Sequence, residues 1–257
     1  MLSDEQLDRY ARHIVLKEIG GEGQARLLAA RITLIGAGGI GSPALQYLAA
    51  AGVGTLRVID DDRVSLDNLQ RQTLFGTGDV GRPKVEAAAE AVARLNPDVR
   101  FEGIECRLDS GNVGELIGGA DLVLDGSDNF ATRLIVSDHC VAARIPLVSA
   151  AIGQFQAQIA TFRGWEATSP CYRCFVGDAF DAEDCDSCSE QGVLGAMAGI
   201  AGSWAALEAV RAITGFGGDS RGKLHVFDGL APALRTVRIV KDPACSACGA
   251  AAQSAAA

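Results

Sequence analysis

The sequence predicts an α/β fold with a parallel sheet. Two short apolar runs, residues 31–36 and 55–60, flank an alanine-rich segment at residues 40–51. An apolar run, a helix and a second apolar run within about 30 residues are typical of two parallel strands joined by a crossover helix. The composition agrees with a globular chain, because 48% of the 257 residues are apolar and 21% are charged. A chain of this size can bury a large core without disulfide bonds.

The N-terminal segment predicts a helix. Ser3-Asp4-Glu5-Gln6 has the side chains of a helix start, and Leu7, Tyr10 and Ile14 recur at helical spacing. We therefore expect one helix from Ser3 to about Lys17.

The remainder of the chain predicts alternating strands and helices that end in an antiparallel pair. Pro83 stands in the first turn of a helix that ends near Leu95, because the fixed φ of proline is tolerated there. A loop rich in cysteine, aspartate and glycine precedes a long buried helix after Gly192. The further expected strands are residues 99–104, 120–124, 146–149, 154–162, 223–227 and 234–240, the last two being antiparallel.

Charge and hydropathy exclude several classes of partner. The formal net charge of −9 argues against a surface that binds nucleic acid or anionic lipid. The N-terminus is charged from its fourth residue, which is unlike a secretory signal. Glycines and Pro43 interrupt the long uncharged stretch at residues 32–56, and the second apolar stretch, residues 191–207, is too short to span a bilayer. We therefore expect a cytoplasmic protein that binds neither nucleic acid nor membrane.

A glycine motif follows the first predicted strand. Gly36, Gly38 and Gly41 fit the pattern GxGxxG, with Gly39 inside it, and Asp60 comes 19 residues after Gly41 at the end of the next strand. Such glycines let backbone amides approach a phosphate at a helix N-terminus, and the acidic residue can bind ribose hydroxyls. The motif alone predicts a nucleotide, and an NAD-dependent oxidoreductase is its default interpretation. A turn that binds no ligand is the alternative.

The residues after Asp60 are unusual for a dinucleotide site. Arg71 and Lys84 follow the second strand, near the edge of the sheet where ligands collect. Cations aimed at phosphates suit a triphosphate that loses pyrophosphate. Asp125 and Asp128 follow a further apolar strand, and Asp128 is a candidate ligand for Mg²⁺. The alternative is that Arg71 and Lys84 are solvated surface charges and that Asp125 or Asp128 caps a helix.

The eight cysteines predict a metal site. Six of them form three CxxC pairs, which are Cys171/Cys174, Cys185/Cys188 and Cys245/Cys248. Two such pairs supply the four sulfur ligands of a tetrahedral Zn²⁺ site, and the spacing leaves three choices of two pairs. The isolated Cys106 and Cys140 are expected in the core, because unpaired cysteine is commonly buried.

These motifs together resemble the MoeB/ThiF/HesA family, the bacterial relatives of ubiquitin-activating enzymes, and MoeB most of all. The resemblance covers nearly the whole chain and implies a twisted, mostly parallel, Rossmann-like sheet with flanking helices, working as a homodimer. It implies one adenylation domain at residues 1–249, with a nucleotide-binding part at about 31–150, a carrier-binding and zinc part at about 151–249, and a disordered tail at 250–257. The segments that carry it are RYARHIVL, IGAGGIGS, AAGVGTLRVIDDDRVSLDNLQRQ, VGRPKVEAA, LDGSDNFATR, CYRC and CSAC.

The family's activity implies a function. Its members use ATP and Mg²⁺ to adenylate the C-terminal glycine of a small ubiquitin-like sulfur carrier protein, and they release pyrophosphate. The resemblance favours the small subunit of molybdopterin synthase as the carrier, in molybdenum cofactor biosynthesis. The thiazole sulfur carrier of thiamine biosynthesis is the alternative. No rhodanese domain follows the last cysteines, so a separate persulfide donor is expected.

The resemblance also assigns roles to single positions. Gly39 would contact the nucleotide phosphates and Asp60 the ribose. Arg12 resembles the arginine that family members insert into the partner subunit's ATP site. Cys188 takes the place of the cysteine that ThiF-type members link to the activated carrier, although the acidic residues around it disfavour a thiolate; a loop cysteine without covalent role stays open, and Cys185 lies outside the family pattern. Asn68, Arg71 and Lys84 would bind the triphosphate, with Gln70 nearby, and Asp128 would bind Mg²⁺, with Asn129 beside it. Structural zinc would be bound by Cys171, Cys174, Cys245 and Cys248. A rival pairing for the zinc site joins Cys171/Cys174 with Cys185/Cys188.

Overall fold

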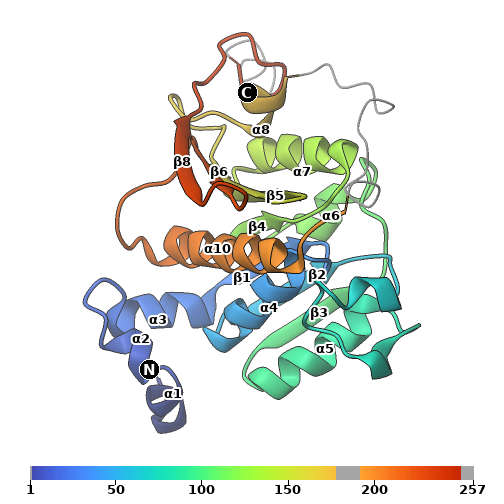
Figure 1. Cartoon of the computed structure of the whole chain (residues 1–257). Coiled ribbons are helices and arrows are strands. Elements are labelled where there is room, and N and C mark those ends of the chain that lie inside the picture. Colours follow the sequence, from blue (N-terminus) through green and yellow to red (C-terminus); the bar gives the residue numbers. More distant parts are fainter. Residues whose placement is uncertain (1, 178–191, 250–257) are drawn as a thin grey trace.

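The computed structural model describes residues 2–177 and 192–249. Their strands form one sheet in the order β3-β2-β1-β4-β5-β6-β7-β8 (Figure 1). From β3 to β5 in that order the neighbouring strands are parallel, and from β5 to β8 they are antiparallel. The strands are β1 (Arg31–Ile35), β2 (Thr55–Ile59), β3 (Arg100–Ile104), β4 (Leu122–Asp125), β5 (Leu147–Gly153), β6 (Gln156–Phe162), β7 (Lys223–Asp228) and β8 (Ala233–Arg238).

Helices cover both faces of this sheet (Figure 1). One face carries α4 (Gly41–Ala50), α5 (Lys84–Leu95) and α10 (Gly195–Thr214). The other carries α6 (Val113–Ile117), α7 (Phe130–Ala143) and α8 (Tyr172–Val176). The N-terminal helices α1 (Asp4–Arg9), α2 (Ala11–Ile14) and α3 (Gly20–Ala29) lie at one end, where α3 packs on α10. Two short 3₁₀ helices, η1 (Leu66–Asn68) and η2 (Thr77–Asp79), follow β2.

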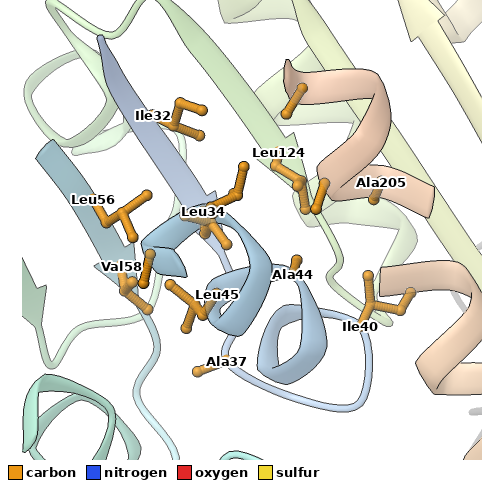
Figure 2. Packing of buried hydrophobic residues seen from close by; sticks show 14 of the residues in the cluster. Ile32, Leu34, Ala37, Ile40, Ala44, Leu45, Leu56, Val58, Leu124 and Ala205 are labelled. Atoms are coloured by element: carbon orange, nitrogen blue, oxygen red, sulfur yellow. The ribbon is translucent and has the colours of Figure 1, made fainter. Parts of the chain in front are cut away.

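The predicted fold class is confirmed, and so is the antiparallel end formed by β7 and β8. The apolar runs form strands because the parallel part of the sheet is buried on both faces. On the α4 and α10 face, side chains of β1, β2 and β4 pack against those helices (Figure 2). The labelled residues of that packing are Ile32, Leu34, Ala37, Ile40, Ala44, Leu45, Leu56, Val58, Leu124 and Ala205.

The prediction of a single helix from Ser3 to Lys17 was wrong. The start is confirmed, because Ser3 Oγ accepts a hydrogen bond from the Gln6 amide at 3.2 Å and Gln6 Oε1 accepts one from the Ser3 amide at 3.2 Å. The helix then breaks at Tyr10, whose ring is buried and whose hydroxyl accepts a hydrogen bond from Asn96 Nδ2 at 2.8 Å. Leu7, in contrast, is 44% exposed. Tertiary burial of one residue therefore overrides the local helical pattern.

Helix α3 was not expected from the sequence, because glycines at positions 20, 21 and 23 have low helix propensity. Packing stabilises it instead. Leu27 is fully buried, and the buried Gln24 donates a hydrogen bond from Nε2 to the Ala51 carbonyl at 2.9 Å. These contacts tie α3 to the end of α4.

Helix α10 occupies the second apolar stretch that the sequence contains, and one of its sides is buried against the sheet and α4. Within the described ranges 2–177 and 192–249, the helices are too short or too polar for a membrane span.

The α10–α4 contact depends on Gly202. A Cβ atom on Gly202 would lie 2.3 Å from the Ile40 carbonyl oxygen and 2.4 Å from Pro43 Cγ. Ile40 lies within the glycine motif, directly before α4, and Pro43 lies in the first turn of that helix. Because backbone and a proline ring cannot move aside cheaply, the helices approach this closely only with glycine at position 202.

We expect Gly202→Ala to lower the free energy of unfolding by about 1–3 kcal/mol, as overpacking in a rigid contact does. Gly199→Ala is the matched control on the same helix, because a Cβ there meets no atom within 4 Å. That variant should be neutral or stabilising by about 0.5–1 kcal/mol, through the higher helix propensity of alanine. Urea unfolding of the two variants measures the difference. Equal stability of both would contradict the proposed close contact.

Candidate functional site

A cleft of about 830 Å³ lies at the carboxyl edge of the parallel strands. This is the edge where open α/β sheets bind ligands, and the volume is within the range of small-molecule sites. Of the described residues predicted to bind the nucleotide or to act on it, nine line the cleft and three, Gly41, Gln70 and Arg12, do not. The nine are Gly36, Gly38, Gly39, Asp60, Asn68, Arg71, Lys84, Asp128 and Asn129.

The glycine loop between β1 and α4 is a tight turn. Gly36 has a φ of +89°, a conformation that favours glycine. A Cβ on Gly41 would lie 2.0 Å from the Gly36 carbonyl oxygen, so the loop closes on itself only with glycine there. Inside the turn, Ser42 Oγ donates a hydrogen bond to the Ala37 carbonyl at 3.1 Å. Gly41 therefore shapes the loop from outside the cleft wall.

Asp60 holds the glycine loop to the end of β2. Its Oδ2 accepts a hydrogen bond from the Ala37 amide at 2.7 Å, and its Oδ1 accepts one from the Asp62 amide at 2.8 Å. Burial raises the pKa of this carboxyl, and the charge of Lys84 together with the two amides opposes that rise. Each carboxylate oxygen keeps a further lone pair for a hydroxyl donor in the cleft.

The two predicted cations lie beside the loop. Lys84 is the first residue of α5 and only 3% exposed, and its Nζ lies 2.7 Å from Asp62 Oδ2. Arg71 is half-buried and donates from a guanidinium nitrogen to the Asp67 carbonyl at 3.1 Å. Its aliphatic carbons lie close to Gly39, 3.5 Å from where a Cβ on that glycine would be. The alternative that Lys84 is a solvated surface charge was wrong.

The polar residues of the loop after β4 have different roles: some hydrogen-bond within the loop and others line the cleft. Asp125 is fully buried, and its Oδ1 accepts hydrogen bonds from the Ser127 amide at 2.9 Å and hydroxyl at 2.7 Å. Among the described residues its Oδ2 has no partner. Asp128 is exposed at the cleft. The helix cap is Asn129, whose side chain accepts from the Thr132 amide at 3.0 Å, so neither aspartate caps α7.

Two buried polar residues of the cleft wall, Gln72 and Arg133, had no predicted role. Gln72 is 4% exposed, and its Oε1 has no hydrogen-bond partner in the described part of the chain. Arg133 is 6% exposed and donates to Ser149 Oγ at 3.2 Å and to the Ala150 carbonyl at 2.8 Å. Both belong to segments with distinctive motifs, NLQRQ and LDGSDNFATR, but their burial depends on long-range packing that the local pattern does not show.

The isolated cysteines differ from each other. Cys140 is buried as expected, and burial raises the pKa of its thiol. The prediction for Cys106 was wrong, because this residue is half-buried in the cleft wall, where Asn112 Nδ2 donates to its sulfur at 3.5 Å. The loop after β3 reaches the cleft edge, so Cys106 packs against the margin of the core and is only partly buried, whereas Leu108 of the same loop is buried.

Two further predicted residues lie elsewhere. Arg12, on α2, is exposed and outside the cleft of its own chain. The backbone of Gln70 packs closely against the start of α10. A Cβ atom on Gly195 would lie 2.1 Å from the Gln70 carbonyl oxygen. Cys185 and Cys188 lie outside the described residues.

Four cysteines gather in a cluster near the C-terminus. The Cys171–Cys245 sulfurs are 3.5 Å apart, the Cys174–Cys248 sulfurs 3.4 Å and the Cys171–Cys174 sulfurs 3.9 Å. All four sulfurs lie within 4.8 Å of one another. Sulfurs bound tetrahedrally to one zinc at about 2.3 Å would be about 3.8 Å apart. The grouping of these two CxxC pairs is therefore confirmed, and its dimensions fit a zinc ion.

The protonation of the cluster also suits a metal. Hydrogen bonds, first from Cys171, lower the pKa of Cys248 to about 5, whereas burial raises the pKa of Cys174 to about 11. The Asp242 amide donates to the Cys174 sulfur at 3.4 Å. A thiolate among thiols is a ready first ligand for a cation, which would displace the remaining protons.

The fold and site together define an α/β protein with a nucleotide-type glycine loop and a four-cysteine knuckle. The ThiF family matches residues 10–247, and the chain belongs to that family, which confirms the resemblance drawn from the motifs.

Named relatives cover nearly the whole chain. The SAMP-activating enzyme E1 of Haloferax volcanii is 45% identical over 96% of this chain and 91% of its own length. The sulfur carrier protein adenylyltransferase of Thermus thermophilus is 43% identical, over 95% and 92%. The molybdopterin-synthase adenylyltransferase of Escherichia coli is 40% identical, over 96% and 98%. Among solved structures, Escherichia coli MccB has the same fold, with a TM-score of 0.82 at 24% identity over 96% of this chain and 73% of that one.

We expect the stability that Asp60 contributes to decrease as the pH rises. Burial raises its pKa in the folded chain above the value of 3.8 that it has without such burial, so the folded chain binds this proton more tightly than the unfolded chain. The contribution is complete below that value and is lost as the pH rises through the folded-state pKa. Urea unfolding of the wild type and of Asp60→Asn, between about pH 4 and pH 7, measures it.

The unfolding free energy of the wild type, relative to Asp60→Asn, should fall toward neutral pH. Asp61→Asn changes an exposed neighbouring carboxyl and serves as the control. A wild-type advantage that is constant or grows with pH would rule out a raised pKa.

Proposed function

We propose that the protein is an ATP-dependent adenylyltransferase that activates the C-terminal glycine of a ubiquitin-like sulfur carrier as an acyl-adenylate. The small subunit of molybdopterin synthase is the favoured carrier. One observation carries the proposal: the glycine loop, the buried Lys84, Arg71 and Asp128 meet in a single cleft. The names of relatives that are 40–45% identical over almost the full chain support it.

The reaction joins a carrier carboxylate oxygen to the α-phosphorus of ATP and breaks the bond to the β-phosphate oxygen, so that pyrophosphate leaves. Magnesium-bound ATP supplies the electrophile and the leaving group. The loop amides at the start of α4 bind phosphate oxygens. Arg71 and Lys84 neutralise the charge that develops on the departing pyrophosphate, and Asp128 offers an oxygen ligand to the cation.

Lys84 can change partners at low cost. Its present partner Asp62 is 68% exposed at the side chain, so water solvates that carboxylate readily when a phosphate takes its place. The ammonium itself stays in a buried position, where its attraction to a phosphate is strong. The Lys84–Asp62 ion pair therefore keeps a largely desolvated ammonium group beside the glycine loop.

Zinc in the four-cysteine cluster completes the proposal. Four sulfurs leave no open position on the metal, so its role is structural.

We assign nucleotide binding to about residues 31–150, and carrier and zinc binding to about residues 151–249. Clustered free thiols need a reducing compartment, which favours the cytoplasm. A separate persulfide donor would supply sulfur to the activated carrier.

The thiazole sulfur carrier is the second candidate substrate. The sulfur carrier protein ThiS adenylyltransferase of Escherichia coli is 38% identical over 96% of this chain and 97% of its own length. An NAD-dependent oxidoreductase, in contrast, has no use for the buried Lys84 next to Arg71.

ATP–pyrophosphate exchange in the presence of each of the two candidate carriers tests the function. We expect carrier-dependent exchange with the molybdopterin synthase subunit. Arg71→Ala and Lys84→Ala should each lower it about 100-fold or more, because each removes charge stabilisation from the transition state. Arg63→Ala is the control, since Arg63 is a 61% exposed side chain that does not line the cleft.

Near-normal exchange by folded Arg71→Ala and Lys84→Ala chains would refute the site. Exchange with the thiazole carrier alone would select the second candidate. Thermal protection by NADH, with none from Mg-ATP, would favour the oxidoreductase.

A homodimer that shares its sites explains the place of Arg12. This side chain is exposed on α2 and does not line the cleft of its own chain. We expect Arg12→Ala and Asp128→Ala to be inactive singly, and a mixed dimer of the two to regain exchange, because one of its sites then holds both intact residues. Exchange by purified mixed dimers is the measurement. Mixed dimers as inactive as their parents would place Arg12 outside the active site.

A further inference from the structure

Helix α8 belongs to both the cysteine cluster and the cleft. Cys171 precedes its first residue and Cys174 lies within it, and both are in the cluster. Tyr172, Phe175 and Val176 of the same helix line the cleft. In Figure 1, α8 lies beside α7, near the described end of the chain. One turn of helix therefore connects the cysteine cluster to the cleft, two sites that were predicted from separate sequence motifs.

This helix depends on its anchors. It has five residues, whereas isolated helices shorter than about 12–15 residues are marginal in water. Arg173 forms a two-pronged ion pair with Asp138 of α7, with both nitrogen–oxygen distances at 2.7 Å. Tyr172 packs edge-on against Phe162 of β6, with ring centroids 5.9 Å apart. The cysteine cluster is the third anchor and joins α8 to Cys245 and Cys248.

The α8 end of the cleft is remote from the phosphate end. The glycine loop and Asp60 follow β1 and β2, whereas Phe162 under α8 belongs to β6. Four strand spacings separate β2 from β6, which is about 19 Å at about 4.8 Å each. A nucleotide held at Asp60 with its phosphates toward Arg71 and Lys84 leaves this end of the cleft to a second substrate.

Strand β6 presents a polar strip beside α8. Gln156 and Gln158 both line the cleft, two residues apart and so on one face of the strand. The next residues of that face, Ala160 and Phe162, are buried in the core under α8. Within residues 2–177 and 192–249, the side-chain amides of the exposed Gln156 and the half-buried Gln158 bond to no other protein group. These two side-chain amides line the same cleft as Tyr172 and Phe175, and they can both donate hydrogen bonds to and accept them from the backbone of an extended peptide.

We propose that Gln158, Tyr172 and Phe175 bind the C-terminal segment of the carrier and that the metal-loaded cysteine cluster positions the two aromatic residues. The proposal rests on the proposed function, since it assigns that function's protein substrate to this end of the cleft. Phe175 is 39% exposed and thus has apolar area to bury on binding. Loss of the metal releases α8 and weakens carrier binding, and the nucleotide end keeps its affinity.

The first test compares Phe175→Ala with Phe155→Ala. Phe155 is a matched control, because it is 38% exposed and outside the cleft lining. The probe is the molybdopterin synthase small subunit with a fluorescent label, and its Kd and the Kd of ATP are measured separately. We expect a loss of carrier affinity of about tenfold for Phe175→Ala, as for an aromatic interface residue, and ATP affinity within about twofold of the wild type. An unchanged carrier Kd would overturn the assignment.

The second test removes the metal from the wild type and from Phe175→Ala with a chelator, and metal analysis confirms the loss. Carrier affinity of the wild type should fall about tenfold and return when zinc is restored. Because Phe175 and the cluster act as a unit, Phe175→Ala should lose little more on metal removal. Equal losses in both chains, or a parallel loss of ATP affinity, would show that the metal acts on general stability and overturn the positioning role.

These outcomes differ from failure of the proposed function. If the metal-loaded wild type binds the labelled carrier and supports exchange, but neither Phe175→Ala nor metal removal changes the carrier Kd, the function stands and this inference falls. If the wild type binds ATP but neither binds nor activates the molybdopterin synthase subunit or the thiazole carrier, both fall.

Discussion

The buried carboxylate of Asp60 joins the end of β2 to the amide of Ala37 in the glycine loop, at 2.7 Å. Burying a charged group is costly, and the structure compensates with a second amide, from Asp62, and with the positive charge of Lys84. The same three elements shape the phosphate end of the cleft. Loop geometry, acid and cation are thus coupled, although the amides and Lys84 offset only part of the cost of burying Asp60, whose pKa stays raised.

Much of this unit could be predicted from the sequence because its signals are local. GxGxxG, the acid at the next strand end and the cations of NLQRQ and GRPK each lie within a short segment, and parallel strands bring their carboxyl ends to one edge. The break at Tyr10 could not be predicted, because it depends on Asn96, which is distant in sequence. Helix α3 was hidden by its glycines, whose low propensity is overcome by packing against α10.

The same distinction applies to the cysteines. Spacing indicated four ligands but left the choice of pairs open, since only the fold brings Cys171 and Cys245 to 3.5 Å. Spacing also gave no sign that α8 faces the cleft, because Tyr172, inside the CxxC pair, and Phe175, directly after it, look like ordinary apolar residues. Cys106 was misplaced for a related reason: a loop that reaches the cleft edge exposes a residue type that is usually buried.

The sheet reverses direction at the cleft. Strand β5 ends at Gly153, Gly153 pairs with Gln156, and β6 then runs back under α8. The turn consists of two residues, so register is fixed by it. A single inserted or deleted residue would turn Gln156 and Gln158 toward α10 and would bring Ala157 and Ile159 to the cleft side. Length changes in this hairpin are therefore far less tolerable than substitutions, and variation in substrate preference has to arise by exchange of side chains on an invariant frame.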